Sequence, residues 1–523
     1  MPTNCLVAVQ LSNSGIIRFP LMTIYNQKEI VMLDYLNQEA NITTTENGAA
    51  TYLSTNSDCL DLFATIGALR CNDEGEILAR FIRAYTEDAD LAMKILFFAR
   101  DIRCGLGERR VFRVILSWLA NHKPNSVKQN LAYIAEYGRY DDYLVLMGTA
   151  CEREMLDFLK AQFDADQQNL DKHGEVSLLA KWLPSVNTSN KEAVYKAKRI
   201  ARAFGMNDAS YRKALSALRA QIRIIENNLR TRDYSFDYEK QPSRAMFKYH
   251  QAFIRNDKKR YMAFAEKVVQ RKAKLHADHI APYELIRPYM VGQTIWDEVK
   301  PISEEEKAVL NATWKALPDF CGDEDMLAVI DTSGSMYANG GLPAAVAFSL
   351  GLYLAEHNKG RFRNRFIEFS SKPRLIPLKG KTFVDKFQYA MTFNEVANTN
   401  LQAVFDLILR AAVYNKLPQK ELPSKLVIVS DMEFDQCVMD ASETNFQRAR
   451  RRFAEQGYKL PDVVFWNVAS RNCQQPVTMN EQGVQLVSGV TPQLFSMIAG
   501  GNYTPYSFMI ETLMSERYER IVA

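Results

Sequence analysis

The chain has 523 residues, of which 47% are hydrophobic and 24% charged, with a formal net charge of +4. A chain of this length and ordinary globular composition is expected to fold into about two or three domains. Its eight cysteines lack a C-x-x-C pair, so we expect neither disulfides nor a structural zinc site. No run of about 18 apolar residues occurs, so no membrane span is expected. No basic segment precedes the first apolar stretch, so we expect no secretory signal and therefore a cytoplasmic protein.

The N-terminal segment, residues 1–57, is expected to be partly irregular. Residues 41–56, NITTTENGAATYLSTN, are rich in Thr, Asn, Ser and Gly, which favour loops. From residue 58 to about residue 305, apolar residues recur every three and four positions, as in CLDLFATIGALR and LAMKILFFARDIR. We therefore predict a HEAT-like body of antiparallel helix pairs over 58–305, which either closes into a ring or stays open.

One part of this helical body is strongly basic. The stretch from Lys191 to Lys274 holds 22 Lys and Arg against 8 Asp and Glu, so the remainder of the chain carries a net charge of −10. If residues 211–230 form one helix, its arginines gather about 100° from the apolar stripe; they are Arg212, Arg219, Arg223 and Arg230. Further cations lie before and after this helix, at Lys198, Arg202, Lys258, Lys259, Arg260, Arg271 and Lys272.

Aligned cations with aromatic side chains nearby suit phosphate contact and base stacking, which favours RNA as a partner. The aromatic residues in question are Tyr249, Phe253 and Tyr261. The alternative is a solvated helix face, partly neutralised by Glu226, on which long cationic side chains only provide solubility. His276 and His279 are expected to be solvent-facing or hydrogen-bonded rather than metal ligands.

After a linker expected at 306–322, short apolar runs alternate with helical stretches. The runs are MLAVI (326–330), RFIEFS (365–370), KLVIVS (425–430), DVVFWNV (462–468) and VQLVS (484–488). This alternation predicts a doubly wound α/β domain over 323–523, with a parallel sheet covered by helices on both faces.

Three loops of this domain offer oxygen donors at the carboxyl ends of strands. Asp331, Ser333 and Ser335 follow the first strand directly, Thr399 precedes a helix, and Asp431 follows KLVIVS. Ligands bind at this edge of such a sheet, and carboxylates with hydroxyls suit Mg²⁺, or else Mn²⁺ or Ca²⁺. The alternative is that Asp331 and Ser333 only cap a turn or a helix.

The DTSGSM motif, with Thr399 and Asp431, resembles the metal-ion-dependent adhesion site of von Willebrand A domains. The resemblance implies one divalent cation whose ligands are completed by an acidic residue of a protein partner. Glu433 and Asp435 are expected to be solvated loop carboxylates, and no catalytic motif is present, so we expect neither an enzyme nor a nucleotide cofactor.

A helical-repeat body followed by such a domain resembles the TROVE/Ro family of RNA-binding proteins. Phrases such as FFARDIRCGLGERRVFR and YEKQPSRAMFKYHQAFIRNDKKRY are similar to an uncharacterised branch of that architecture. The resemblance implies a ribonucleoprotein in which the basic helical body holds a small structured non-coding or misfolded RNA. The alternative is a metal-dependent protein-interaction scaffold with no role in RNA binding.

Overall fold

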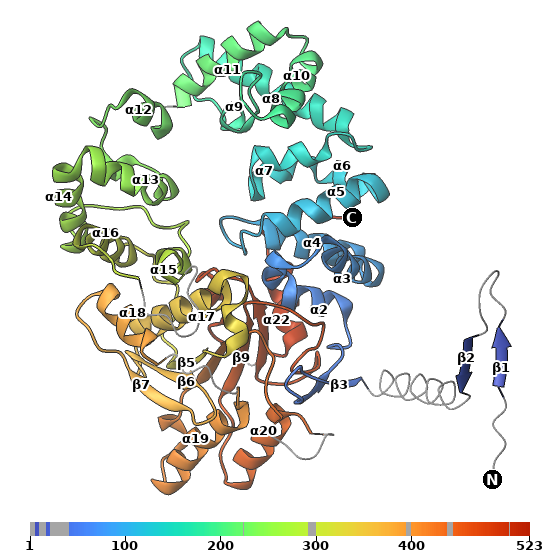
Figure 1. Cartoon of the computed structure of the whole chain (residues 1–523), viewed down its shortest axis with the longest axis vertical. Helices are drawn as coiled ribbons and strands as arrows, with labels where there is room; N and C mark the ends of the chain where they lie inside the picture. The colour runs from blue at the N-terminus through green and yellow to red at the C-terminus, as the bar shows by residue number, and fades with distance from the viewer. Residues whose placement is uncertain are drawn as a thin grey trace.

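The computed structural model describes residues 41–222, 224–290, 300–393, 399–436, 443–501 and 503–523. It also places the backbone of two short antiparallel strands, β1 (Leu6–Val9) and β2 (Ile17–Pro20). The described residues form a helical body and an α/β domain (Figure 1). The expectation of an α plus α/β chain is confirmed at this level.

The helical body consists of short helices joined by short connections. In chain order they are α2 (Asp58–Thr65), η1 (Ile66–Cys71), α3 (Glu74–Glu87), α4 (Ala89–Arg100), α5 (Arg110–His122), α6 (Pro124–Gln129), η2 (Leu131–Tyr133), α7 (Ile134–Tyr137), η3 (Tyr140–Leu146), α8 (Glu152–Asp171), α9 (Leu179–Trp182), α10 (Lys191–Ala203), α11 (Asp208–Ile222), α12 (Ile225–Thr231), η4 (Tyr238–Lys240), α13 (Ser243–Asn256), α14 (Lys258–Val269), α15 (Tyr283–Met290) and α16 (Glu304–Lys315). Side chains of Ser57, Asp73 and Asp88 cap the first turns of α2, α3 and α4, which satisfies backbone N–H groups there.

The α/β domain contains one six-stranded sheet. Its strands are β5 (Met326–Asp331), β6 (Arg365–Phe369), β7 (Arg374–Pro377), β8 (Lys425–Ser430), β9 (Asp462–Asn467) and β10 (Val484–Ser488). Its helices are η5 (Gly334–Tyr337), α17 (Ala338–His357), α18 (Phe383–Met391), α19 (Leu401–Tyr414), η6 (Gln419–Glu421), α20 (Asn445–Glu455), α21 (Leu494–Ile498) and α22 (Pro505–Leu513).

The strand order is β10-β9-β8-β5-β6-β7, and all neighbours are parallel except β6 and β7. The sheet therefore carries an antiparallel edge strand that the sequence did not predict, because only Ile376 of β7 is buried. At the centre of the sheet β5 and β8 pair in register, with Ile330 opposite Val429. This register brings the residues that follow both strands to the same edge.

The stretch Gly334–His357 is apolar and long enough to cross a membrane, the only such helix among the described residues, and 83% of its apolar window is buried inside the protein. Its position explains this composition, since α17 contacts β5 on one side and α15 of the helical body on another. Burial on several sides requires apolar residues around the whole helix.

The helices follow an arc that leaves the α/β domain and returns to it (Figure 1). At the start of the arc α2 packs against β10, and near its end α15 packs against α17. The C-terminal residues reinforce the start of the arc, because α22 contacts α2 and α4, and Arg517 lies 2.6 Å from Asp101. The described elements are thus arranged as a ring closed by the α/β domain.

Two local expectations were wrong, and a third was incomplete. Residues 306–322 are not all linker, since α16 extends to Lys315 and packs on α14 and α18. Residues 211–230 do not form one helix, because α11 ends at Ile222 and α12 begins at Ile225. Residues 41–56 contain a hairpin, β3 (Ile42–Thr44) and β4 (Ala50–Tyr52), whose turn uses Gly48 at φ +84°.

Candidate metal centre and basic groove

The five residues predicted to bind a metal lie at the carboxyl edge of the sheet. Asp331 ends β5, Ser333 and Ser335 follow it, Thr399 precedes α19, and Asp431 follows β8. Asp331, Ser333, Thr399 and Asp431 are buried, whereas Ser335 is half-buried.

Hydrogen bonds hold these loops in place. Asp331 accepts a hydrogen bond from the Ser430 hydroxyl at 2.5 Å and another from the Ser333 backbone N–H at 2.8 Å. The hydroxyl oxygens of Ser333 and Ser335 are 3.1 Å apart. The structure therefore brings the first three predicted ligands together beside the end of β8.

Thr399 joins the same edge through the loop that follows Asp431. Its hydroxyl donates to the Glu433 carbonyl at 2.8 Å and lies 3.2 Å from an Asp435 carboxylate oxygen. Asp435 in turn is half-buried, and burial raises its pKa although its hydrogen bonds with Thr399 oppose the rise. No hydrogen bond joins Thr399 to Asp331 among the described residues.

The two aspartates form a pair of crowded negative charges. Burial and the neighbouring Asp431 carboxylate raise the pKa of Asp331 well above its ordinary value, although hydrogen bonds from Ser430 and Ser333 oppose the rise. The Oδ2 atom of Asp431 is buried and accepts no hydrogen bond from the described residues. Arg471 offsets part of this charge from one side, and a divalent cation would offset the rest, so the donor set fits such an ion.

Within the described residues, no group of three or more His, Cys, Asp or Glu side chains is arranged to hold a metal. The candidate centre falls outside that pattern because its remaining donors are hydroxyl groups. This composition is typical of sites for hard cations, which prefer oxygen ligands.

An arginine that no sequence pattern singled out lies beside this centre. Arg471, which follows β9, lies 3.2 Å from Asp431 Oδ2 and 2.7 Å from a Glu46 carboxylate oxygen. Glu46 belongs to the turn of the β3–β4 hairpin. The only available signal was a charged residue directly after a predicted strand, which is too common to identify a site.

Glu433 was expected to be a solvated carboxylate, and this was wrong. Its side chain is 2% exposed and accepts hydrogen bonds from the Glu46 backbone and from the amides of Asn472 and Gln474. The Asn47 side chain also donates to the Glu433 carbonyl at 2.8 Å. Glu433 therefore anchors the β3–β4 hairpin beside the metal centre.

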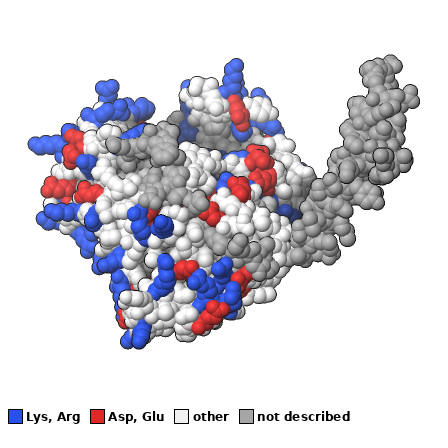
Figure 2. Space-filling model, turned by 60° about the horizontal axis from the view of Figure 1, so that its bottom comes forward, with Lys and Arg blue, Asp and Glu red and all other residues white. Residues whose placement is uncertain are grey.

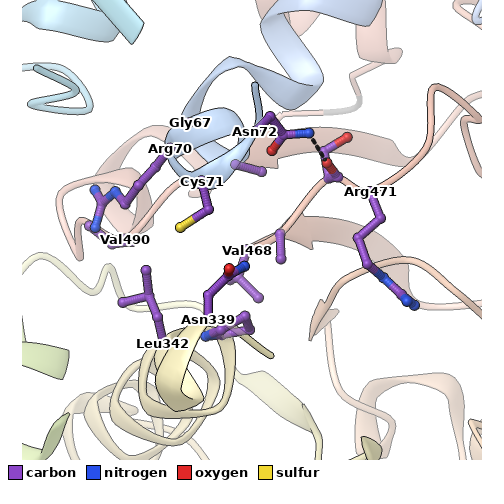
Figure 3. Close-up of a pocket in the computed structure, with 13 residues that line it drawn as sticks. Gly67, Arg70, Cys71, Asn72, Asn339, Leu342, Val468, Arg471 and Val490 are labelled. Carbon is purple, nitrogen blue, oxygen red and sulfur yellow. Dashed lines mark hydrogen bonds between the residues drawn. The ribbon is translucent and has the colours of Figure 1, made fainter. Parts of the chain in front are cut away.

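A small cavity of about 260 Å³ opens next to this edge, between η1, the start of α17 and the loop after β9. Figure 3 shows Arg70 and Arg471 at its opposite ends, with the Cys71 thiol directed into the space beside Asn339. Asn72 donates a hydrogen bond of 2.8 Å to the Ser470 carbonyl across one wall. The cavity gives a partner side chain room to approach the sheet edge.

The second candidate site is a groove in the helical body. We call it the α11–α12 groove; it encloses about 1510 Å³ between α11, α12 and residues 236–242. Its basic residues are Arg212, Lys213, Arg219, Arg230 and Lys240, and no Asp or Glu belongs to its lining. Asn187, Asn227, Asn228, Gln241 and the ring of Phe236 complete the polar and aromatic surface.

The structure brings Arg212 and Arg230 to this groove, although they lie on different helices. Arg223, predicted between them, lies outside the described residues. Arg219 has a different role from the predicted one. Its guanidinium donates 2.8 Å hydrogen bonds to the carbonyls of Ala180 and Leu183 and to the Ser185 hydroxyl, so it fastens the segment after α9 to α11.

The other predicted cations do not line this groove. Lys198 lies 3.6 Å from Asp208, Lys258 lies 2.6 Å from Glu305, and Arg260 lies 2.7 Å from Asp257. Arg271 lines a separate cavity of about 470 Å³ between α14 and the α/β domain. The exposed side chains of Arg202, Lys259 and Lys272 also lie outside the groove lining.

The aromatic residues expected to stack on bases are not available for that purpose. Phe253 and Tyr261 belong to the core formed by α12, α13, α14 and α16. Tyr249 is half-buried and donates a hydrogen bond of 3.0 Å to Glu226. Elsewhere on the molecule, basic and acidic side chains are interspersed, as Figure 2 shows for the face that carries the α/β domain.

Comparisons with known proteins agree with this division of the chain. Residues 45–162 and 153–320 match a domain of unknown function, DUF2828. Together the two matched segments span more than half of the chain. The chain belongs to the DUF2828 family. Residues 325–506 match a second domain of unknown function, DUF7788, so the boundary between the two matches falls directly before β5.

Two individual proteins are also similar to this chain. An uncharacterized protein, L728, of Acanthamoeba polyphaga mimivirus is 29% identical over 519 residues, covering 91% of this chain and 87% of the relative. The crystal structure of the Ro (RSR) protein of Deinococcus radiodurans is 14% identical, with a TM-score of 0.33 over 85% of this chain and 99% of that chain. At that TM-score, function must be argued from the residues of this chain.

Proposed function

We propose that this DUF2828 protein is a non-catalytic RNA-binding protein that holds RNA in the α11–α12 groove. We further propose that the edge of its α/β domain holds one divalent cation, Mg²⁺ or else Mn²⁺ or Ca²⁺, and binds an acidic residue of a protein partner there. The observation that carries the RNA proposal is a large groove lined by five cations and no carboxylate.

The chemistry of the groove fits a single-stranded or looped nucleic acid. Arg212, Lys213 and Arg230 are exposed and form no ion pair with the described residues, so they are free to contact phosphates. Amide side chains at the groove can donate to and accept from base edges, and the half-buried ring of Phe236 offers a stacking surface. The resemblance of the sequence to TROVE/Ro proteins supports the same partner class, a small structured non-coding or misfolded RNA.

The metal half of the proposal rests on the two crowded aspartates. Asp331 and Asp431 would supply the negative charge, and the hydroxyls of Ser333, Ser335 and Thr399 the remaining protein ligands, as in a von Willebrand A domain. A bound cation would offer an open coordination position to a carboxylate of the partner. The cavity at Arg471 and Asn339 leaves space for that group.

A non-catalytic role is supported by the carboxylates near the centre. Glu433 is buried and its oxygens accept hydrogen bonds from three donors, so it is not poised to take a proton from a substrate. Asp435 is engaged with Thr399.

The first test is sequencing of the nucleic acid that co-purifies with the full chain. The groove variant Arg212→Glu/Arg230→Glu should lose a defined RNA class that the unchanged protein retains. Arg153→Glu is a control with one charge reversal away from the groove, because Arg153 is 92% exposed on α8 and lies outside the groove lining. Equal RNA recovery from both variants and the unchanged protein would contradict RNA binding in the groove.

The second candidate function is a metal-dependent protein scaffold without RNA, and the crowded pair of Asp331 and Asp431 is the observation that favours it. Under that hypothesis Asp331→Ala abolishes a protein complex in pull-down experiments. The Arg212→Glu/Arg230→Glu variant then leaves both the complex and the recovered nucleic acid unchanged.

A further inference from the structure

A fourth cavity lies where the two ends of the helical arc meet the α/β domain. It encloses about 540 Å³ and is lined by the loop before α5, the start of η3, residues of α13 and α15, and residues 317–320 and 490–493. We call it the arginine pocket, because its lining includes Arg70, Arg100, Arg109, Arg110, Arg139 and Arg244. Its volume is within the range of about 300–1000 Å³ typical of small-ligand sites.

Four of these arginines are matched by carboxylates. Arg70 pairs with Glu108, Arg100 lies 2.8 Å from Asp142, Arg109 lies 2.8 Å from Asp141, and Arg244 lies 2.7 Å from Glu284. The third acidic residue of the lining, Asp278, lies 3.8 Å from His276. Arg110 and Arg139 have no carboxylate partner among the described residues. The Arg110 Nη1 donates hydrogen bonds to the carbonyls of Arg70 and Asn72, which are neutral and leave its charge unbalanced, so the pocket keeps an excess of positive charge.

Arg139 shows the effect of this excess. Its guanidinium is stacked 4.8 Å from the centre of the Trp182 ring, which holds it in place without neutralising it. Burial, together with the positive charges of Arg100, Arg109 and Arg244, lowers the pKa of Arg139, although Asp141 opposes this. An anion beside Arg139 would relieve this repulsion.

The loop from Gly105 to Arg110 adds a second feature that favours an anion. It lines the pocket and leads into α5, a helix of 13 residues whose first turn has neither an acidic residue nor a side-chain cap. Uncapped N–H groups and the helix dipole at such an end attract phosphate groups. Gly107 has φ +68°, and a Cβ at Gly105 would clash with the Phe98 carbonyl, so the turn requires both glycines.

The rest of the lining is apolar or aromatic. Ile280, Tyr283, Phe320 and Pro492 supply flat or apolar surface beside the arginines. A ligand that satisfies both parts of the pocket has a phosphate group joined to a planar ring system, as a nucleotide has.

We infer that the arginine pocket binds a nucleotide through its phosphate, with Arg110 and Arg139 as the phosphate ligands. The nucleotide is either a free nucleoside phosphate or the 5′-phosphorylated end of an RNA, which share this chemistry. The inference does not depend on RNA binding in the α11–α12 groove, because no residue belongs to both linings.

The test measures binding of four probes to the full chain by calorimetry: ADP, adenosine, and an RNA octamer with either a 5′-phosphate or a 5′-hydroxyl. We expect at least one phosphate-bearing probe to bind more tightly than its phosphate-free partner. Arg139→Gln and Arg110→Gln should each weaken it about tenfold, the effect of losing one charge-assisted contact of about 1.4 kcal/mol. Arg110 is exposed, so its variant keeps the test valid if Arg139→Gln impairs folding.

Binding of ADP identifies a free nucleotide as the ligand, and binding of only the phosphorylated octamer identifies an RNA end. The control Arg153→Gln should change neither affinity. The Arg212→Glu/Arg230→Glu variant separates this inference from the proposed function, since it should leave ADP binding and the 5′-phosphate preference intact. Equal binding of probes with and without phosphate, or no effect of Arg110→Gln, would overturn the inference.

Discussion

Removing two positive charges from the α11–α12 groove should reduce the salt dependence of RNA binding by a calculable amount. The groove presents four exposed cations, Arg212, Lys213, Arg230 and Lys240, whereas Arg219 is occupied by carbonyl groups. For a single strand, each phosphate neutralised by a cation of the protein contributes about −0.7 to the slope of log K against log salt. Four contacts give a slope of about −2.8, hence a loss of roughly 50-fold in affinity between about 50 and 200 mM salt.

The variant Arg212→Gln/Arg230→Gln keeps two of these contacts, so its slope should be about −1.4 and its loss over the same range roughly 7-fold. Fluorescence anisotropy of a labelled single-stranded RNA, titrated at several salt concentrations, measures both slopes. Arg153→Gln, a single substitution of the same kind outside the groove, should retain the original slope. An identical slope in the groove variant and the unchanged protein would refute the assignment of phosphate contacts to this groove.

Three further predictions concern stability. Arg219→Ala should lower the free energy of unfolding by about 3 kcal/mol in urea titrations, because two carbonyl groups and one hydroxyl lose a charged donor. Arg212→Ala, the control, should change the free energy of unfolding by less than about 0.5 kcal/mol. Mg²⁺ at about 100 times its Kd should stabilise the protein by about 2.7 kcal/mol, seen as a higher Tm that Asp331→Ala abolishes; no shift would contradict the metal centre. Burial lowers the pKa of His250, but hydrogen bonds with Glu306 and the Phe247 carbonyl outweigh this and raise it. The stabilisation contributed by protonated His250 is therefore complete below the unfolded pKa of about 6.5 and is lost as pH rises through the higher folded pKa. Tm should therefore fall as pH rises above about 6.5, and less so in His250→Gln.

The centre of the α/β domain could be predicted from sequence because each buried strand is a continuous apolar run. MLAVI and KLVIVS became the adjacent strands β5 and β8, and the residues directly after them had to reach one edge of the sheet. The position of Asp331 beside Asp431 follows from that topology. The hairpin at Glu46 and the approach of Arg471 could not be predicted, since they depend on pairing between segments more than 380 residues apart.

The basic segment shows where local periodicity is insufficient. The predicted continuous helix over 211–230 placed Arg219 on an exposed stripe. In the structure α11 ends at Ile222, and the Arg219 guanidinium donates to the carbonyls of Ala180 and Leu183, so it has a structural role. Likewise, the sequence around Phe253 and Tyr261 does not distinguish an exposed ring that could stack on a base from a ring buried in the core, where the structure places both.

The arginine pocket had no sequence signature at all. Its lining runs from Arg70 to Gln493 and is assembled only when the helical arc meets the α/β domain. The expectation of no nucleotide cofactor rested on the absence of a contiguous phosphate-binding motif. The inferred nucleotide site would not need such a motif, because separate helices contribute its cations.

The central claim, that RNA lies in the α11–α12 groove, is tested most directly by ultraviolet cross-linking of bound RNA followed by mass spectrometry of the peptides. We predict cross-linked nucleotides on peptides from residues 208–242, with Phe236 among the modified positions. Cross-links confined to other parts of the chain, with none on these peptides, would contradict it.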